Sequence, residues 1–226
     1  MYRHIMALGF LLGSTGLAAA QALPGFSAGD VVVRLAATGI MPLAASSHID
    51  TIGGTVGVTS TPAPEMDISY FLTDHISVQL IATATRHEIS ASNTALSGLL
   101  GSKIDLASTY VLPPAVVAQY NFFPHAAFDP YVGVGVDFLS PFDTQENKLA
   151  LPGVGQVVQK VGLSNAVGPT FDIGLNYNIS GPWFVNIDYK QILDRVDARV
   201  HTVLGLVKAN VDLDPAVLSA GIAYRF

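Results

Sequence analysis

Hydrophobic and polar residues alternate along several stretches of the chain. The pattern is plainest at 171–179, where Phe171, Ile173, Leu175, Tyr177 and Ile179 alternate with Asp, Gly and Asn residues. The same period of two recurs at 132–138, 183–191 and 218–226, and in weaker form at 29–40, 65–72, 76–88 and 114–122. Successive side chains of a β-strand point to opposite faces. These stretches therefore predict eight strands, each with one apolar and one polar face.

The composition of the polar faces indicates which face is inside. A soluble β-sandwich or lipocalin-like barrel displays its polar faces to water and needs many charges there. Only 12% of this chain is charged, half of it is hydrophobic and its mean hydropathy is +0.45, whereas soluble domains carry about 25% charged residues. We therefore expect the polar faces to line a small lumen and the apolar faces to contact lipid.

The sequence after residue 22 contains no plausible membrane-spanning helix. Its longest stretch without Asp, Glu, Lys or Arg is 106–128, and Pro113-Pro114 interrupts this stretch near its middle. Proline breaks helices because it lacks the amide donor. A closed β-barrel is the other architecture that satisfies all backbone groups in lipid.

Residues 1–22 have the features of a secretory signal peptide. Arg3 and His4 precede an apolar run from Ile5 to Leu17, and Ala20-Gln21-Ala22 supplies an A-x-A cleavage pattern. The alternative is an uncleaved anchor, but the run is shorter than the roughly 20 residues that a spanning helix needs. We expect a signal peptide at 1–22 and an outer-membrane β-barrel domain at 23–226.

Short junctions at 73–75, 123–130 and 180–182 divide the predicted strands into pairs, with longer connections near 41–54, 89–108, 139–166 and 192–211. Aromatic residues gather around these junctions and the C-terminus, as in the girdle of a membrane interface. They are Tyr70, Phe71, Tyr120, Phe122, Phe123, Phe128, Tyr131, Tyr177, Trp183, Phe184, Tyr224 and Phe226. The predicted fold is all-β, an eight-stranded antiparallel up-and-down transmembrane barrel with short periplasmic turns and long extracellular loops. Its expected location is the outer membrane of a Gram-negative cell.

Several segments resemble the OmpW family of outer-membrane proteins. They are Gly29–Arg34, Pro64–Ile76, Leu112–Pro114 followed by Gln119–Phe122, Asp129–Val136, Trp183–Lys190, Asp212–Pro215 and Tyr224–Phe226, in the family's order. The resemblance implies a narrow barrel, proposed to pass small hydrophobic molecules, and its AlkL-like branch is associated with uptake of alkanes and similar compounds. Tyr224 and Phe226 also resemble the C-terminal signal recognised by the outer-membrane assembly machinery.

Inward-facing polar residues are expected to fill the lumen, because an eight-stranded barrel is only wide enough for side chains. This predicted lumen plug, a network of hydrogen bonds and ion pairs, comprises Arg34, Asp67, Gln79, Gln119, Asn121, Asp172, Asn186, Asp188, Lys190 and Arg225. An apolar solute would not cross such a plug readily. We therefore favour a route from the extracellular mouth along an apolar funnel, with lateral exit through the wall into the membrane.

Two sets of residues are candidates for that route. Proline cannot donate to a strand ladder, so Pro113, Pro114 and Pro215 mark either a lateral opening or a strand start or bulge. Apolar residues of the connections form either the funnel or simple loop packing: Leu96, Leu99, Leu100, Leu149, Leu151, Val154, Leu204 and Leu206. The stretch 154–163 is predicted to form a short amphipathic helix over the mouth.

Other chemistry finds little support in the sequence. The absence of cysteine removes thiolate metal sites and thiol nucleophiles, and the six histidines lack ligand spacing, so we expect no metal and no cofactor. The net charge of −6 argues against nucleic acid as a partner. Asp194, Asp197, Asp212 and Asp214 form either a cation site or, as we prefer, a solvated acidic rim.

Three classes of function follow in order of preference. The first is passage of small hydrophobic solutes by a barrel embedded in outer-membrane lipid. The alternative is a plugged structural or receptor barrel, whose loops bind partners or support envelope integrity. An enzyme is not expected, because no nucleophile motif stands out, although sequence alone does not reveal a catalytic triad.

Overall fold

The structure is a computed structural model that describes residues 25–43, 49, 53–95, 101–148, 150–151, 155–203 and 205–226. The predicted signal peptide lies outside these residues. The described part of the chain contains no helix that is long and apolar enough to cross a membrane.

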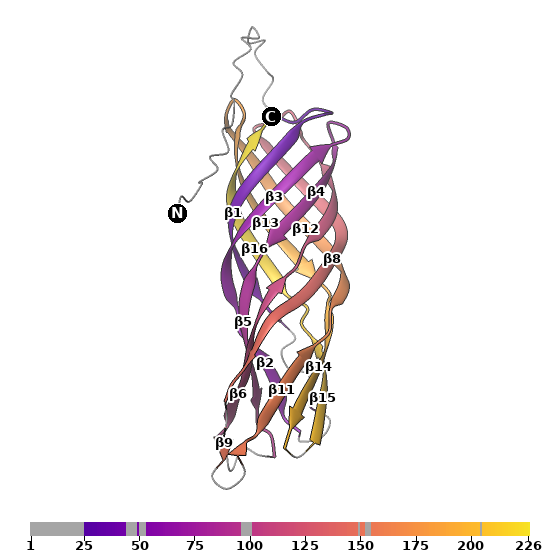
Figure 1. The fold of residues 1–226 in the computed structure, drawn as a ribbon. Helices are drawn as coiled ribbons and strands as arrows, with labels where there is room; N and C mark the ends of the chain where they lie inside the picture. The colour runs from indigo at the N-terminus through magenta and orange to yellow at the C-terminus, as the bar shows by residue number, and fades with distance from the viewer. Residues whose placement is uncertain are drawn as a thin grey trace, which may run out of the picture.

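The strands of the barrel pair in one closed, antiparallel order (Figure 1). The order is β12 (Ala166–Ser180), β13 (Trp183–Ile192), β16 (Ala216–Arg225), β1 (Val31–Met41), β3 (Thr61–Phe71), β4 (Ile76–Thr83), β7 (Ala115–Asn121) and β8 (Phe128–Glu146). Pairing of β8 with β12 closes the cylinder, with Phe171 opposite Val134. The predicted eight-stranded barrel is confirmed.

Further strands lengthen the barrel at the end opposite the short turns (Figure 1). β2 (Thr55–Val58), β5 (Thr85–Ser92) and β6 (Lys103–Leu112) pair in series and join the distal half of β8. β11 (Val158–Leu163), β14 (Arg195–Thr202) and β15 (Gly205–Asp212) form a three-stranded sheet, and β9 (Ala150–Leu151) pairs with β10 (Gly155–Gln156). Much of the connections predicted near 89–108, 139–166 and 192–211 is thus β-strand.

The helix predicted over 154–163 is wrong. Residues 155–156 and 158–163 are strands, and β11 pairs with β14. A register shift between Val158 and Lys160 marks a β-bulge. Val158 and Val161 are both buried, so the bulge produces a spacing of three residues that resembles one face of a helix.

The alternation of the sequence becomes the two sides of the barrel wall. On β12, Asp172 is 4% exposed and faces inward, whereas its neighbour Ile173 is 58% exposed. Leu35, Val134 and Leu218 are likewise exposed on other strands. The outer face is therefore the apolar one, as expected for contact with lipid.

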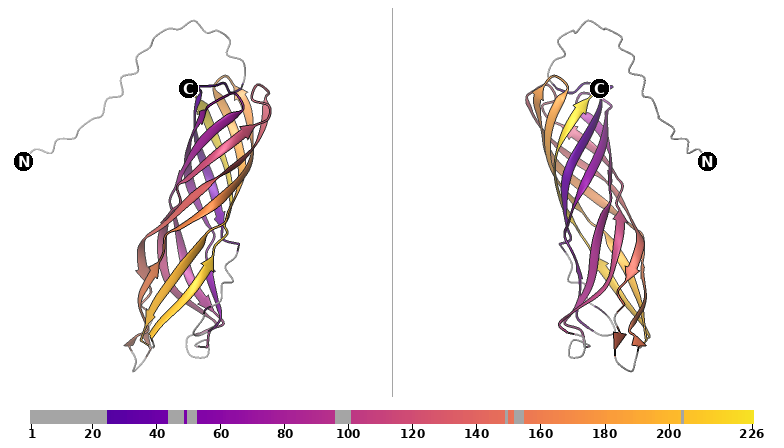
Figure 2. Two further views of the ribbon diagram at one scale, coloured as in Figure 1. Left: turned by 90° about the vertical axis from the view of Figure 1, so that its right-hand side faces the viewer. Right: turned by 60° about the vertical axis from the view of Figure 1, so that its left-hand side comes forward.

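Most of the predicted aromatic girdle lies at the end with short turns, where the C-terminus also lies (Figure 2). Phe128 packs on Tyr177 at a ring-centroid distance of 4.7 Å, and Trp183 packs edge-on against Tyr224 at 4.9 Å. Three members were assigned wrongly, because their side chains are buried: Phe71, Tyr131 and Phe184. Each occupies an inward position of its strand, which the crowding of aromatics in the sequence does not reveal.

Candidate functional site

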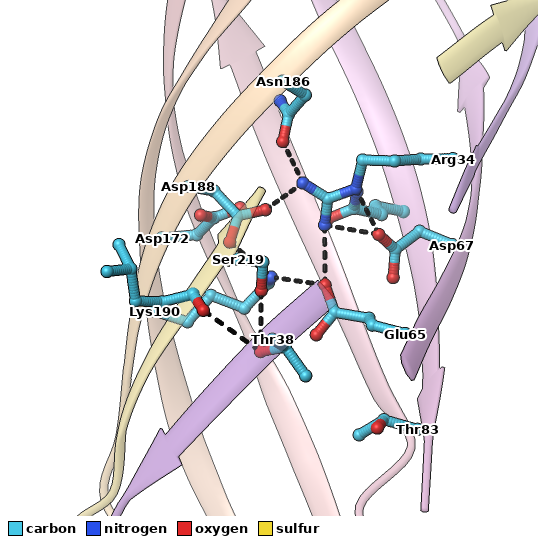
Figure 3. Close-up of polar contacts among 12 residues, drawn as sticks. Arg34, Thr38, Glu65, Asp67, Thr83, Asp172, Asn186, Asp188, Lys190 and Ser219 are labelled. Atoms are coloured by element: carbon cyan, nitrogen blue, oxygen red, sulfur yellow. Dashed lines mark hydrogen bonds and ion pairs between the residues drawn. The ribbon is translucent and has the colours of Figure 1, made fainter. Parts of the chain in front are cut away.

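A layer of charged side chains fills the middle of the barrel, with Arg34 of β1 at its centre (Figure 3). The Arg34 guanidinium donates a 2.8 Å hydrogen bond to Glu65 and also contacts Asp67, Asn186 and Asp188. Because strand residues two apart share a face, β3 presents Glu65 and Asp67 to the lumen while β13 presents Asn186 and Asp188.

Lys190 completes this layer from the next inward position of β13. Its ammonium group donates to Asp188 at 2.7 Å and to Glu65 at 3.2 Å, and the Lys190 side chain is 2% exposed. We call Arg34, Glu65, Asp67, Asn186, Asp188 and Lys190 the polar layer. Because these ion pairs are buried, each charge needs its partner: removing one partner leaves an unpaired buried charge, which destabilises the fold strongly.

Amide side chains extend the network on the opposite wall. Gln119 of β7 donates to the Gln79 side-chain oxygen at 2.9 Å and to the Asp172 carboxylate at 2.7 Å. Asn121 is 1% exposed and donates to Ser77 Oγ at 3.4 Å. The structure thus brings these residues and the polar layer into one lumen.

Arg225 lies apart from this network. Its Nε is 3.8 Å from Asp30, and its guanidinium lies 6.0 Å from the centre of the Phe184 ring. Glu65 is absent from the predicted lumen plug, although it lies two residues before Asp67 and so shares the inward face of β3. Tyr131, predicted to belong to the girdle, joins this network instead, because its hydroxyl accepts a 3.1 Å hydrogen bond from Asn186.

An aromatic stack closes the lumen at the end with short turns. Phe26 is 2% exposed and lies between Phe71 and Phe184, with centroid distances of 4.5 Å to each ring. Its amide donates a 2.7 Å hydrogen bond to the carbonyl of Pro124. A small polar pocket, lined by Phe26 and Arg34 among others, separates this stack from the polar layer.

A largely apolar cavity lies on the other side of the polar layer. It has about 1040 Å³ of space, part of it open to solvent, and Glu65 and Lys190 contribute to its lining. Most of its wall is aliphatic, as at Ile40, Ile192 and Val217. A second apolar cavity continues toward the distal end and shares Val56, Ile89, Leu163 and Ala198 with the first.

The candidate prolines have different surroundings. Pro113 and Pro215 line the first cavity, together with Pro42 and Pro141. Near Pro215 the strands remain bonded, because the Ile192 amide donates to the Pro215 carbonyl at 3.1 Å. Near Pro113 and Pro114 the ladder is interrupted on one side: Ile81 pairs with Ala115 and Thr85 with Val111, with no ladder pair between these two among the described residues. On the other side the strands stay bonded, because the Phe138 amide donates to the Pro114 carbonyl at 2.9 Å.

Most of the candidate funnel residues lie in parts of the chain that the structure does not describe. Leu96, Leu99, Leu100, Leu149, Val154 and Leu204 lie outside the described residues, as does the side chain of Leu151. Leu206 is 43% exposed. The second cavity is lined instead by other apolar residues of the distal strands, among them Val157, Val158 and Val207.

The expected acidic rim needs correction at one position. Asp194 is 1% exposed and lines the first cavity with Asp137, which is also 1% exposed. The alternation of β13 continues past its end, with Ile192 and Asp194 buried and Leu193 between them exposed, so a count by twos along the sequence would have placed Asp194 inward. Within the described ranges, no group of three or more His, Cys, Asp or Glu side chains has the arrangement of a metal site.

An antiparallel eight-stranded barrel, apolar outside and polar within, defines an integral outer-membrane protein. The OmpW family profile matches residues 27–226, so the chain belongs to the OmpW family. It is 30% identical to an uncharacterised outer-membrane protein of Sinorhizobium fredii, over 99% of this chain and 96% of that one. Identity to outer membrane protein AlkL of Ectopseudomonas oleovorans is 24%, over 98% and 95% of the two chains.

Solved structures agree with the fold. The crystal structure of outer membrane protein OprG from Pseudomonas aeruginosa superposes with a TM-score of 0.79 at 24% identity, covering 90% of this chain and 99% of that one. The family match and the outer-membrane relatives confirm the predicted family and the outer-membrane location. The side with short turns is the periplasmic side in this class of barrel, and the distal strands extend outside the cell.

Proposed function

We propose that this barrel passes small hydrophobic molecules from the extracellular side into the membrane, by lateral exit through its wall. The observation that carries the proposal is the position of the polar layer. Glu65 and Lys190 line the apolar cavity, whereas Arg34 lines the polar pocket on the periplasmic side. The apolar route from outside therefore ends at a layer of buried ion pairs.

The two halves of the lumen suit different solutes. A hydrocarbon gains by leaving water for the aliphatic cavity, by roughly 25 cal/mol per Å² of apolar surface buried. To continue along the axis it would have to separate Arg34 and Lys190 from their carboxylates and then displace Phe26. Breaking a buried ion pair costs several kcal/mol. Sideways exit avoids that barrier.

The interrupted ladder around Pro113 and Pro114 is the proposed exit. Residues on both sides of the interruption line the cavity, among them Thr83 and Pro113. Leu80, Leu112 and Val116 are exposed on the outer wall nearby, at 51%, 42% and 43%. A solute leaving here passes directly from the cavity to a lipid-facing surface. Pro114 is bonded on one side, where the Phe138 amide donates to its carbonyl at 2.9 Å. Pro215 is the less favoured place, because hydrogen bonds span the wall on both sides of it, from Ile192 to Pro215 and from Leu43 to Leu213.

Restoring amide donors at the interruption tests the exit. Pro113→Val and Pro114→Val, singly and combined, are expected to reduce uptake of an alkane into proteoliposomes toward the rate of empty vesicles. Pro62→Val is the matched control, because Pro62 lies in β3 where pairing with Gly39 continues the ladder. Unchanged uptake in the double variant, with heat-modifiable migration showing that it has folded, would refute exit at this place.

The alternative is a plugged structural or receptor barrel. The polar layer and the Phe26 stack favour it, because together they close the periplasmic half. It predicts no uptake above empty vesicles even for the wild-type protein. The candidate funnel leucines are part of the transport proposal, which the same uptake assay tests.

Tyr224 and Phe226 remain the proposed signal for the outer-membrane assembly machinery. Phe226 is 73% exposed and packs edge-on against Tyr224 at 4.7 Å. An exposed terminal ring is available to a binding partner. Phe226→Ala is expected to lower the amount of assembled barrel in the outer membrane without altering refolding in detergent, and loss of refolding as well would contradict a signalling role.

A further inference from the structure

Two buried carboxyl groups lie in the wall of the apolar cavity, above the polar layer. Asp137 of β8 and Asp194, which follows β13, both line this cavity. Apart from the two groups themselves, no donor within the described parts of the chain hydrogen-bonds to any of their four carboxyl oxygens. The two groups instead interact with each other. We call Asp137 and Asp194 the carboxyl pair.

The backbone makes room for the carboxyl pair. Gly168 of β12 lies directly opposite Asp137 in the ladder. A side chain at position 168 would collide with the Asp194 carboxylate and with the Leu193 carbonyl. The missing side chain of Gly168 thus leaves the space in which the two carboxyl groups approach each other.

An uncharged polar group faces the same cavity. Thr170 lies two residues beyond Gly168, so it shares the inward face of β12. It is 1% exposed and lines the cavity, and its hydroxyl has no partner in the described residues. Buried hydroxyl and carboxyl groups are normally hydrogen-bonded. In this largely apolar cavity the Thr170 hydroxyl has no partner and the two carboxyl groups have none but each other, which indicates a missing ligand.

The charge balance indicates what that ligand carries. In the lumen below, Glu65, Asp67, Asp172 and Asp188 already outnumber Arg34 and Lys190. The charged neighbours that act on the carboxyl pair are the two members themselves and Asp214, all acidic. A pair of close carboxyl groups favours either a shared proton or an added cation. A cation with several N–H donors satisfies both carboxylates and the Thr170 hydroxyl.

We infer that the cavity binds amphiphilic amines, with the ammonium head on Asp137, Asp194 and Thr170 and the alkyl chain along the aliphatic wall. This inference rests on the proposed function, since it assigns a class of solute to the same cavity. It predicts that a primary alkylamine binds more tightly than the alcohol or the alkane of equal chain length.

Binding of hexylamine, 1-hexanol and hexane to the barrel in lipid nanodiscs tests this assignment, with empty nanodiscs giving the partition background. The wild-type protein is expected to bind hexylamine about tenfold more tightly than hexanol, because hydrogen bonds to charged groups are stronger than those between neutral groups. Asp137→Asn and Asp194→Asn should each abolish that preference and leave hexane binding unchanged. Asp105→Asn is the matched control, because the Asp105 side chain is 59% exposed.

The infrared carboxyl bands provide a second readout. Hexylamine should convert a protonated carboxyl signal into carboxylate in the wild-type protein and in Asp105→Asn, but not in Asp137→Asn. Equal binding of amine and alcohol, or an amine preference that survives both Asn variants, would overturn the assignment. If hexane binding and uptake persist in that case, the proposed function stands. If no solute binds or passes, the proposed function fails as well.

Discussion

The Arg34 guanidinium donates a 2.8 Å hydrogen bond to the Glu65 carboxylate, and their side chains are 4% and 1% exposed. This contact joins the neighbouring strands β1 and β3 on their lumen side. It also ties Arg34 to Lys190 of β13, which bonds to the same Glu65 carboxylate. Burial of both partners means that neither charge has water as a substitute. The contact is therefore central to the closure of the axial route.

Arg34→Met is expected to destabilise the barrel by about 3–5 kcal/mol, because it leaves carboxylates buried without their main cation. Equilibrium unfolding by urea in lipid vesicles measures this change. Arg86→Met is the control: Arg86 is on the exposed face of β5, donates to Ser108 and lies over Tyr110. Its loss should cost less than about 1 kcal/mol. Equal destabilisation by the two substitutions would contradict the role assigned to Arg34.

Phe26→Ala is expected to open the periplasmic end. The chain has no cysteine, so one introduced thiol reports access to the lumen. Ser69→Cys places it in the polar pocket between Phe26 and Arg34, at a position that is 8% exposed. We expect this thiol to react slowly with a polar maleimide in the parent protein and at least tenfold faster after Phe26→Ala.

Phe123→Ala is the matched control for the periplasmic stack, because Phe123 lies at the same end but is 60% exposed. It should leave the labelling rate of Ser69→Cys unchanged. Equal labelling in all three backgrounds would mean that Phe26 does not close the lumen.

The periplasmic segment that carries Phe26 is expected to depend on pH through Asp74. The Asp74 carboxylate accepts hydrogen bonds from the Ala28 amide at 2.8 Å and from His125 at 3.1 Å. These bonds lower the pKa of Asp74, the Ala28 amide contributing most. A depressed pKa means that the contact stabilises the fold at pH values above the ordinary aspartate range and is lost as pH falls through the folded-state pKa.

Hydrogen exchange at the Ala28 amide measures that contact. Protection is expected to persist from neutral pH through the ordinary aspartate range and to decrease only in stronger acid. Asp74→Asn should remove the acid-dependent step. A step at the pKa of a free aspartate in the parent protein would contradict the proposed stabilisation.

The alternation of the sequence predicts the barrel well, because one side of each strand faces lipid and the other the lumen. At Ile173 and Asp172 the two environments are adjacent in the chain, and the pattern assigns both correctly. The same logic identifies Arg34, Asp67 and Asp188 as inward residues. Their partners follow from strand register, which is a long-range property: Arg34 and Asp188 are 154 residues apart.

The distal half was predicted less well because its strands lie outside the lipid. Water on the outer face removes the requirement for an apolar exterior, so β14 and β15 carry charges, such as Arg199 and Lys208, at facing positions. The bulge in β11 gives a helical spacing to buried valines. Asp194 continues the alternation of β13 beyond the end of the strand, two residues after the buried Ile192, so its inward direction follows from a count by twos. Its approach to Asp137 depends on the pairing of β8 with β12, which is a long-range property that the sequence does not give.

Uptake of a radiolabelled alkane into proteoliposomes containing the folded wild-type barrel tests the central claim most directly. Vesicles of the same lipid without the barrel give the background. In both kinds of vesicle, an alkane-binding protein enclosed in the interior binds the alkane that has entered. The proposed route predicts uptake well above background, a loss of that excess in Pro113→Val/Pro114→Val, and its retention in Pro62→Val. Uptake equal to that of empty vesicles would contradict transport and leave the plugged structural or receptor barrel as the account of this protein.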